Sequence, residues 1–417
     1  MHKDLQHMTH KINSITIILT LFIIMYLPVF VSYFGDYHIF IFQFIFPVYL
    51  FFMFARHIRI KQSHVLILTS YLVLTFFAMV FFYDNSVVDL FHLSSYLMII
   101  IGTYGFAIYV LQRDEHNIKK IFKTILSILF LCLFTEYFFA YLGFDNANYW
   151  DFEIYNALNY IHGNPASTLN TFGNIGSGKG VTPSYILLSI VAVSYLYRGS
   201  NVRYFLLLSI LVYLGMMTYS RAFMLALVVY FLFEISFGSF KRFFKYFLVF
   251  FLILIYIIYF YYDFINIFIR IDLGGSENIS GKGVDDDPRM KLLLMQIQSI
   301  QDKFIFGYGW SGMNQHFIDM FGRSTSGELG MVSYWTEQGI LRASYIYALI
   351  IISLYKTLKF IKSRENLFKE VYAASLLILV FNFFWGATSV SNTRTVLMWF
   401  FIFLVLNIRN KKVIITK

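Results

Sequence analysis

The sequence predicts an all-α integral membrane protein with about twelve transmembrane helices, and its composition and charge distribution carry that prediction. Of its 417 residues, 59% are hydrophobic and only 13% are charged, which is more apolar surface than a water-soluble protein of this length needs. The net charge of +10 does not indicate a nucleic-acid partner, because the basic residues lie in short clusters between apolar runs. Cys132 is the only cysteine, so we expect neither a disulfide nor a metal site built on cysteines.

The apolar runs define the expected helices. A hydrocarbon core roughly 30 Å thick needs about 20 apolar residues in a helix, and shorter helices are tolerated inside a bundle. This criterion predicts a single polytopic membrane domain over residues 1–417. Its spans lie near 13–33, 37–54, 65–83, 93–111, 121–143, 181–197, 204–219, 221–238, 246–262, 339–355, 368–386 and 395–408.

The basic residues predict the orientation of these spans. With the N-terminus in the cytoplasm, 23 of the 33 Lys and Arg residues fall on the inner side, as the positive-inside rule requires. An even number of spans then leaves both termini in the cytoplasm. Two long polar segments, 144–180 and 263–338, lie on the outer side. Irregular backbone is excluded from lipid, so we expect the chemistry in these two loops.

The first outer loop ends in the glycine-rich string "FGNIGSGKGVTPSY". It resembles a nucleotide-binding P-loop, but Gly180 follows Lys179 where that motif needs Ser or Thr. We therefore expect Lys179 and the neighbouring backbone N–H groups to contact a phosphate group at most.

In the second outer loop, the string "GVDDDPRMKLLLMQIQSI" predicts a short helix that starts at Pro288 and lies on the membrane surface. Arg289 then falls in its first turn, where free N–H groups and a guanidinium attract anions. The alternative is a surface ion pair with Asp285 or Asp286.

The string "FGYGWSGMNQHF" follows, and its glycines predict a sharp turn. Tyr308 offers a flat face on which a sugar can stack. His316 is either an acid or base or simply a polar loop residue. Glu328 and Glu337 are the carboxylates nearest the membrane on this side; one can act in chemistry while the other fixes structure.

Arg221, in "MMTYSRAFML", is an ionisable residue at the outer end of an apolar span. Its guanidinium either reaches the interface as an anchor or holds an anionic part of a substrate. Arg394, in "SNTRTVLMW", starts the last span at the same level.

Taken in order, the motifs "TP", "SRAF", a large loop with an arginine, "FGYGW" and "E-x-G-I" resemble the O-antigen polymerase and O-antigen ligase family, over roughly residues 170–345. The resemblance implies a C-type glycosyltransferase-like fold in the bacterial inner membrane, with both long loops and the active site in the periplasm. It also implies glycans linked to undecaprenyl pyrophosphate as substrates, no nucleotide sugar, no cofactor and no metal.

The resemblance further implies roles for individual residues. Arg221 and Arg289 match the arginines that hold the donor pyrophosphate. Ligases carry a histidine as the base near the position where this chain has Glu328, and this departure favours the polymerase branch. We therefore expect Glu328 to be the general base, with Glu337 and His316 as alternatives.

Two other functions stay open. One is an O-antigen ligase that transfers glycan to the lipid A core. The other is a transporter or flippase of the lipid-linked oligosaccharide, although paired broken helices, which are typical of transporters, are not evident. The expected partners are the lipid-linked oligosaccharide, membrane lipids and, from the resemblance, a polysaccharide chain-length regulator.

Overall fold

The computed structural model consists of α-helices with one short 3-10 turn, and none of the residues that it describes lies in a strand. It describes residues 2–27, 30, 45–58, 62–83, 86–111, 114–141, 181–197, 201–216, 221–237, 296–321, 330–363, 368–384 and 393–408. The all-α prediction is confirmed for this part of the chain.

The helices follow the order of the predicted spans. Each predicted span except the ninth overlaps one of them; the ninth, near 246–262, and the loop 144–180 lie outside the described residues. The elements are α1 (His2–Met25), α4 (Phe46–Phe54), η2 (Ala55–His57), α5 (Gln62–Phe82), α6 (Ser86–Leu111), α7 (Asp114–Tyr141), α9 (Val181–Leu196), α10 (Asn201–Met216), α11 (Arg221–Phe237), α15 (Gly309–Phe321), α16 (Gly330–Ser363), α17 (Lys369–Phe384) and α18 (Thr393–Asn407).

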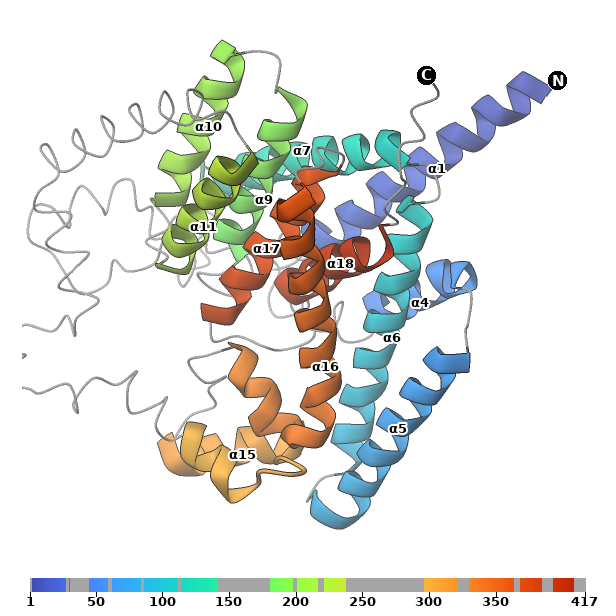
Figure 1. Cartoon of the computed structure of the whole chain (residues 1–417), viewed down its shortest axis with the longest axis vertical. Coiled ribbons are helices and arrows are strands. Elements are labelled where there is room, and N and C mark those ends of the chain that lie inside the picture. The colour runs from blue at the N-terminus through green and yellow to red at the C-terminus, as the bar shows by residue number, and fades with distance from the viewer. Residues whose placement is uncertain are drawn as a thin grey trace, which may run out of the picture.

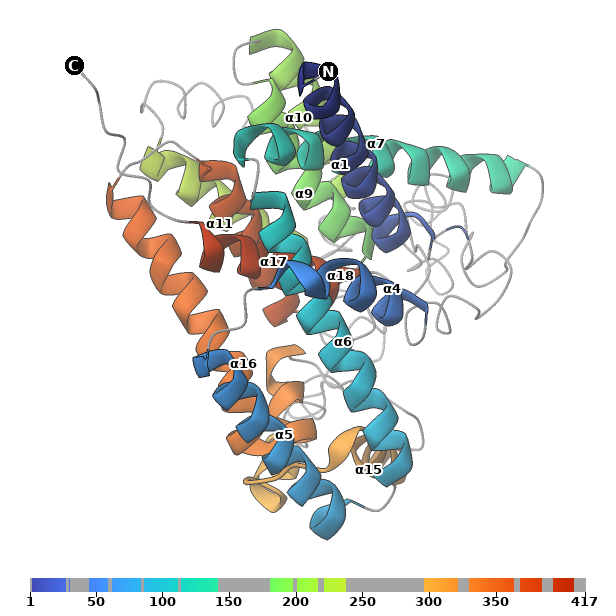
Figure 2. The same ribbon diagram turned by 90° about the vertical axis from the view of Figure 1, so that its right-hand side faces the viewer.

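Two stretches of these helices, Asp89–Leu111 and Val332–Lys362, are long and apolar enough to cross a membrane. Six shorter apolar helices accompany them. These apolar helices are consistent with a membrane protein. In both views α7 lies across the long direction of α6 and α16 (Figures 1 and 2), and the number of twelve crossings stays a prediction.

The core is centred on α18, whose residues from Val396 to Ile402 are all buried. Trp399 and Phe400 are fully buried, and α18 packs against α6, α17 and α16. On α9, Tyr185 is equally buried and donates its hydroxyl to the Met25 carbonyl oxygen of α1, 2.8 Å away. A helix that is apolar on every face, as α18 is here, is typical of the centre of a bundle.

The outer surface of α5 is apolar. Leu66, Val73 and Phe76 are 72%, 61% and 68% exposed, and no described helix covers them. A large exposed apolar face on a helix of this length indicates contact with lipid rather than with water.

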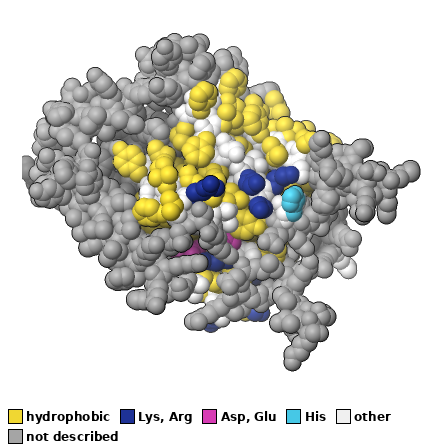
Figure 3. All heavy atoms as spheres, turned by 90° about the horizontal axis from the view of Figure 1, so that it is seen from above, with side chains coloured by type: hydrophobic (Ala, Val, Ile, Leu, Met, Phe, Trp, Pro, Cys, Tyr) yellow, Lys and Arg dark blue, Asp and Glu magenta, His cyan; other side chains and the backbone are white. Residues whose placement is uncertain are grey.

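The two ends of the molecule differ. The start of α1 and the beginning of α10 lie at the upper end in Figure 1, whereas α15, the end of α5 and the start of α6 lie at the lower end (Figures 1 and 2). Seen from above, Lys and Arg side chains are set among hydrophobic ones (Figure 3). This arrangement agrees with a cytoplasmic upper end, and the orientation itself stays a prediction.

The large outer loop is more helical than the range 263–338 suggests. Residues 296–302 are helical, α15 follows at Gly309, and α16 begins at Gly330 rather than near 339. Gly339 interrupts α16 with φ 67° and ψ 168°. The predicted span therefore begins at a kink, and a helical segment precedes it.

Candidate functional site

The kink in α16 docks onto the turn formed by "FGYGW". Gly307 and Gly309 have φ values of 71° and 73°, so the predicted sharp turn is confirmed at these two glycines, while Gly312 lies inside α15. Across the contact, Tyr308 N donates to Thr336 O at 3.0 Å and Ile340 N donates to Phe304 O at 2.9 Å. The motifs "FGYGW" and "E-x-G-I" thus form one hydrogen-bonded unit.

Only glycine fits at the centre of this contact. A Cβ on Gly339 would lie 2.2 Å from Ile305 O, and one on Gly307 would lie 2.5 Å from Glu337 O. Both positions also need a positive φ, which residues with a side chain rarely adopt. The glycines therefore allow two backbones to approach each other.

Arg342 donates hydrogen bonds to carbonyl groups on both sides of the contact. Its Nε donates to Gln338 O at 2.9 Å, and its Nη2 donates to Phe306 O at 2.9 Å. Tyr83, which follows α5, donates its hydroxyl to the same Phe306 oxygen at 3.0 Å, and the guanidinium lies 5.2 Å from the Tyr83 ring centre. Arg342 is only 4% exposed. Its hydrogen bonds offset the cost of burying these polar groups.

Asp89 of α6 holds the start of α15. Its Oδ1 accepts from Ser311 N at 3.0 Å and its Oδ2 accepts from Ser311 Oγ at 2.8 Å. A carboxylate at a helix N-terminus is stabilised by the free N–H groups there. One turn later on α6, His92 stacks on Trp310 with ring centres 4.7 Å apart. The first turn of α15 is therefore bound to α6 by two hydrogen bonds and one ring stack.

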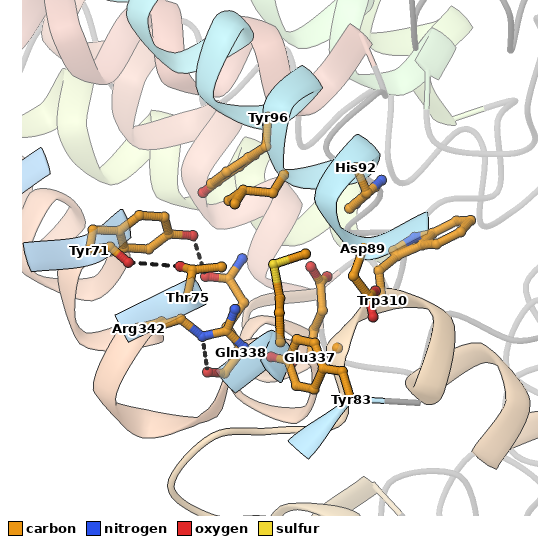
Figure 4. A pocket seen from close by; sticks show the side chains of 13 residues that line it. Tyr71, Thr75, Tyr83, Asp89, His92, Tyr96, Trp310, Glu337, Gln338 and Arg342 are labelled. Atoms are coloured by element: carbon orange, nitrogen blue, oxygen red, sulfur yellow. Dashed lines mark hydrogen bonds between the residues drawn. The ribbon is translucent and has the colours of Figure 1, made fainter. Parts of the chain in front are cut away.

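These contacts line a small cavity beside the start of α15 (Figure 4). Its internal volume is about 20 Å³, room for roughly one water molecule. Glu337 and Asp89, 7% and 5% exposed, contribute two carboxylates. The lining residues are Tyr71, Thr75, Met79, Tyr83, Asp89, His92, Leu93, Tyr96, Gly309, Trp310, Glu337, Gln338 and Arg342.

The wall of the cavity carries several polar groups. Tyr71 donates its hydroxyl to Gln338 Oε1 at 3.0 Å, whereas His92 Nε2 is buried without a hydrogen-bond partner among the described residues. Buried polar atoms normally have partners. Among those residues, no group of three His, Cys, Asp or Glu side chains could hold a metal ion. The wall therefore offers hydrogen-bonding groups to a small polar guest.

Tyr308 and His316 form a second cluster, on the outer side of the turn. Their rings stack with centres 4.3 Å apart, and Lys303 Nζ lies 4.6 Å from the Tyr308 ring centre. His316 Nε2 and Ser299 Oγ are 2.8 Å apart. Burial lowers the pKa of the His316 imidazole and raises the pKa of the Tyr308 hydroxyl. Neither residue lines the cavity.

The other predicted site residues are only partly placed. Arg221 is the first residue of α11 and Arg394 the second of α18, but their side chains are outside the described part of the chain. Glu328, Arg289 and Lys179 lie outside it altogether. Of the predicted site residues whose side chains the structure describes, only Glu337 lines the cavity.

Among the cavity residues that the sequence interpretation missed are three with acidic, basic or imidazole side chains: Asp89, His92 and Arg342. A signal for two of them was present, because Asp89 and Arg342 are charged residues inside the long apolar stretches 89–111 and 332–362, and such residues are functional candidates by default. His92 carried no comparable signal, since its importance depends on the stacked Trp310, which is distant in the sequence.

Comparison with known proteins gives one match. Residues 205–337 match a family model described as O-antigen ligase. No curated protein and no solved structure matches the chain significantly. The matched stretch contains Arg221, the large outer loop and Glu337, and it ends just before the Gly339 kink. This match confirms the resemblance to the O-antigen ligase and polymerase family, whose members are integral inner-membrane enzymes of the glycosyltransferase type that act on lipid-linked glycans.

Proposed function

We propose that the protein is an O-antigen polymerase. It transfers the growing glycan from undecaprenyl pyrophosphate onto the next lipid-linked repeat unit at the periplasmic face. The family match supports the class of reaction. The buried carboxylate of Glu337, held in a polar cavity by the "FGYGW" turn, is the observation that best supports chemistry at this end of the molecule.

The reaction needs two kinds of groups. A hydroxyl oxygen of the acceptor sugar attacks the anomeric carbon of the donor glycan, and the bond from that carbon to the pyrophosphate oxygen breaks. Undecaprenyl pyrophosphate leaves with the bonding electrons, and the proton of the hydroxyl passes to a base. Cations must therefore stabilise the leaving pyrophosphate, and a general base must face the hydroxyl.

Arg221 and Arg289 supply the cations in this proposal. A guanidinium binds two phosphate oxygens at once and stays charged at neutral pH. Lys179 and Arg394 are further contacts for the pyrophosphate. The test is Arg221→Lys, which keeps the charge but loses the two-pronged contact; polymer of normal length from this variant would return Arg221 to the role of an interfacial anchor.

Glu328 is the proposed base, with Glu337 and His316 as alternatives. The geometry favours Glu337 over His316, because Glu337 lines the cavity whereas His316 Nε2 already pairs with Ser299. O-antigen ladders from a deletion strain complemented with Glu328→Gln or Glu337→Gln separate the two carboxylates. The variant that removes the base leaves single repeat units only.

The decisive experiment uses purified protein in liposomes with lipid-linked repeat units. A polymerase converts them into longer lipid-linked chains without any other protein. Unchanged repeat units, with transport across the bilayer instead, would contradict the proposal and support a flippase.

The family description favours one rival, an O-antigen ligase. A deletion strain distinguishes a polymerase from a ligase. Loss of a polymerase leaves single repeat units on the lipid A core, whereas loss of a ligase leaves the core without any repeat unit.

A further inference from the structure

The charges around the cavity are unsuited to a phosphate group. Among the described lining residues, two carboxylates, Asp89 and Glu337, face it with a single cation, Arg342. That cation already donates Nε and Nη2 to the main-chain oxygens of Gln338 and Phe306. A negatively charged guest would be repelled by an ionised carboxylate in a site of low dielectric constant. The cavity therefore suits a neutral guest.

The hydrogen-bonding groups favour a hydroxyl. Carboxyl oxygens accept hydrogen bonds, so Glu337 suits a guest that donates one. A hydroxyl group donates one hydrogen bond and also accepts, and His92 Nε2 is a buried atom in the same wall without a partner among the described residues. A volume of about 20 Å³ admits a group of the size of water and excludes a whole sugar ring.

We infer that the cavity is the site for a hydroxyl group of the acceptor glycan, separate from the site that holds the donor pyrophosphate. Glu337 accepts the hydrogen bond of this hydroxyl. Asp89 is a positioning residue, because both of its oxygens hold Ser311 and thereby fix Trp310 and the start of α15 as one wall. This inference rests on the proposed function, since it names which of the two glycan substrates the cavity binds.

The residues that fix this wall belong to a different part of the chain from the family match. Asp89 and His92 lie on α6, outside residues 205–337. The large outer loop by itself therefore cannot form the cavity, because α6 supplies one carboxylate and the ring on which Trp310 stacks. Acceptor binding should accordingly depend on the contact between α6 and α15.

The test is a binding measurement with two ligands on full-length protein in lipid nanodiscs. One ligand is the repeat-unit oligosaccharide released from its lipid; the other is undecaprenyl pyrophosphate without sugar. Glu337→Gln and Asp89→Asn preserve side-chain shape. Both should weaken oligosaccharide binding, by about tenfold or more for Glu337→Gln because one of the two acceptor oxygens is replaced by an NH2 group, which cannot accept a hydrogen bond. Binding of undecaprenyl pyrophosphate should stay within about twofold, as mutations at separate sites do not couple.

Two controls sharpen the result. Asp319→Asn alters an exposed carboxylate on α15 that accepts from Gln315 Nε2, and it should change neither affinity. Ser311→Ala removes the hydroxyl donor to Asp89 Oδ2 but keeps the donor at Ser311 N, so it should weaken oligosaccharide binding no more than Asp89→Asn does. A merely structural role for Asp89 would lower both affinities together.

The outcomes are distinct. Weakened binding of undecaprenyl pyrophosphate with unchanged oligosaccharide binding would make the cavity a donor site and overturn the inference. If Glu337→Gln leaves both affinities unchanged, the role of Glu337 is overturned as well, and the same holds for Asp89→Asn and the role of Asp89. If the unaltered protein binds neither ligand, the proposed function itself fails, whatever the variants do.

Discussion

Gly339 is the residue on which the geometry of the site depends most directly. Its φ of 67° and ψ of 168° belong to a region that only glycine occupies readily, and a Cβ there would meet Ile305 O at 2.2 Å. We expect Gly339→Ala to destabilise the fold by about 1–3 kcal/mol from backbone strain alone and to abolish polymer formation. Thermal unfolding in detergent and O-antigen ladders measure the two effects.

Gly312 is the matched control for this prediction. It lies inside α15, and the nearest atom to an added Cβ is Tyr308 Cβ at 3.7 Å, an ordinary contact. Gly312→Ala should therefore leave stability unchanged or raise it by about 0.5–1 kcal/mol. Equal losses in the two variants would show that the kink has no special role.

Arg342 gives a second prediction for single residues. Arg342→Lys keeps a positive charge but cannot reach both Gln338 O and Phe306 O with fixed geometry. We expect a lower unfolding temperature and loss of activity, because one of the two carbonyl oxygens loses its Arg342 donor, and Phe306 O then depends on the Tyr83 hydroxyl alone. A variant with unchanged unfolding temperature would mean that water replaces the lost hydrogen bonds.

The site was only partly predictable from single residues. The glycines of "FGYGW" indicated the turn at 307 and 309, since positive φ is a local property of the chain. Local patterns do not reveal that Asp89 contacts Ser311, a residue 222 positions away. Arg342 was missed for a related reason, because its role appears only when the kink and the turn are seen together.

Among the helices, α11 and α17 are joined by an ion pair. Lys369 Nζ lies 2.7 Å from Glu234 Oε2, with the lysine side chain 8% and the glutamate side chain 28% exposed. Because Arg221 starts α11 at the other end, this pair helps to fix the helix that presents the proposed pyrophosphate ligand.

A double-mutant cycle tests the pair. Glu234→Gln and Lys369→Met should each lower the free energy of unfolding, and the double variant should lose less than the sum, with a coupling of about 0.5–3 kcal/mol. The measurement is unfolding in a detergent series. Additive losses would mean that the two charges do not stabilise the contact between α11 and α17.

At the level of elements, apolar run length predicted where helices occur but not how they end. α16 illustrates the difference, since the run after Gly339 indicated a span while residues 330–338, which mix apolar and polar side chains, gave no such signal. The end of that segment is bonded to the turn at 304–308, because Tyr308 N donates to Thr336 O. Tertiary contacts of this kind override local composition.

For the whole molecule, the distribution of basic residues and the shape of the bundle agree. The exposed residue Lys359 belongs to the last turns of α16, which end towards the upper side with the start of α1, whereas α15 lies at the lower end. The positive-inside rule places such basic ends in the cytoplasm. The predicted orientation therefore implies that Lys359 faces the cytoplasm and that α15 faces the periplasm.

Cysteine labelling tests this orientation. Cys132 is the only cysteine and is buried, so it can be replaced and single new cysteines can be introduced at chosen positions. In a Cys132→Ser background, we expect Asp319→Cys on α15 to react with a membrane-impermeant maleimide added to intact spheroplasts. Lys359→Cys should react only after the membrane is permeabilised. Phe76→Cys, at a side chain that is 68% exposed on α5, should react in neither case, because the hydrocarbon core contains neither water nor the reagent. Labelling of Lys359→Cys in intact spheroplasts would place the cavity on the cytoplasmic side, where undecaprenyl-linked glycans are not polymerised in the proposed reaction, and would contradict both proposals at once.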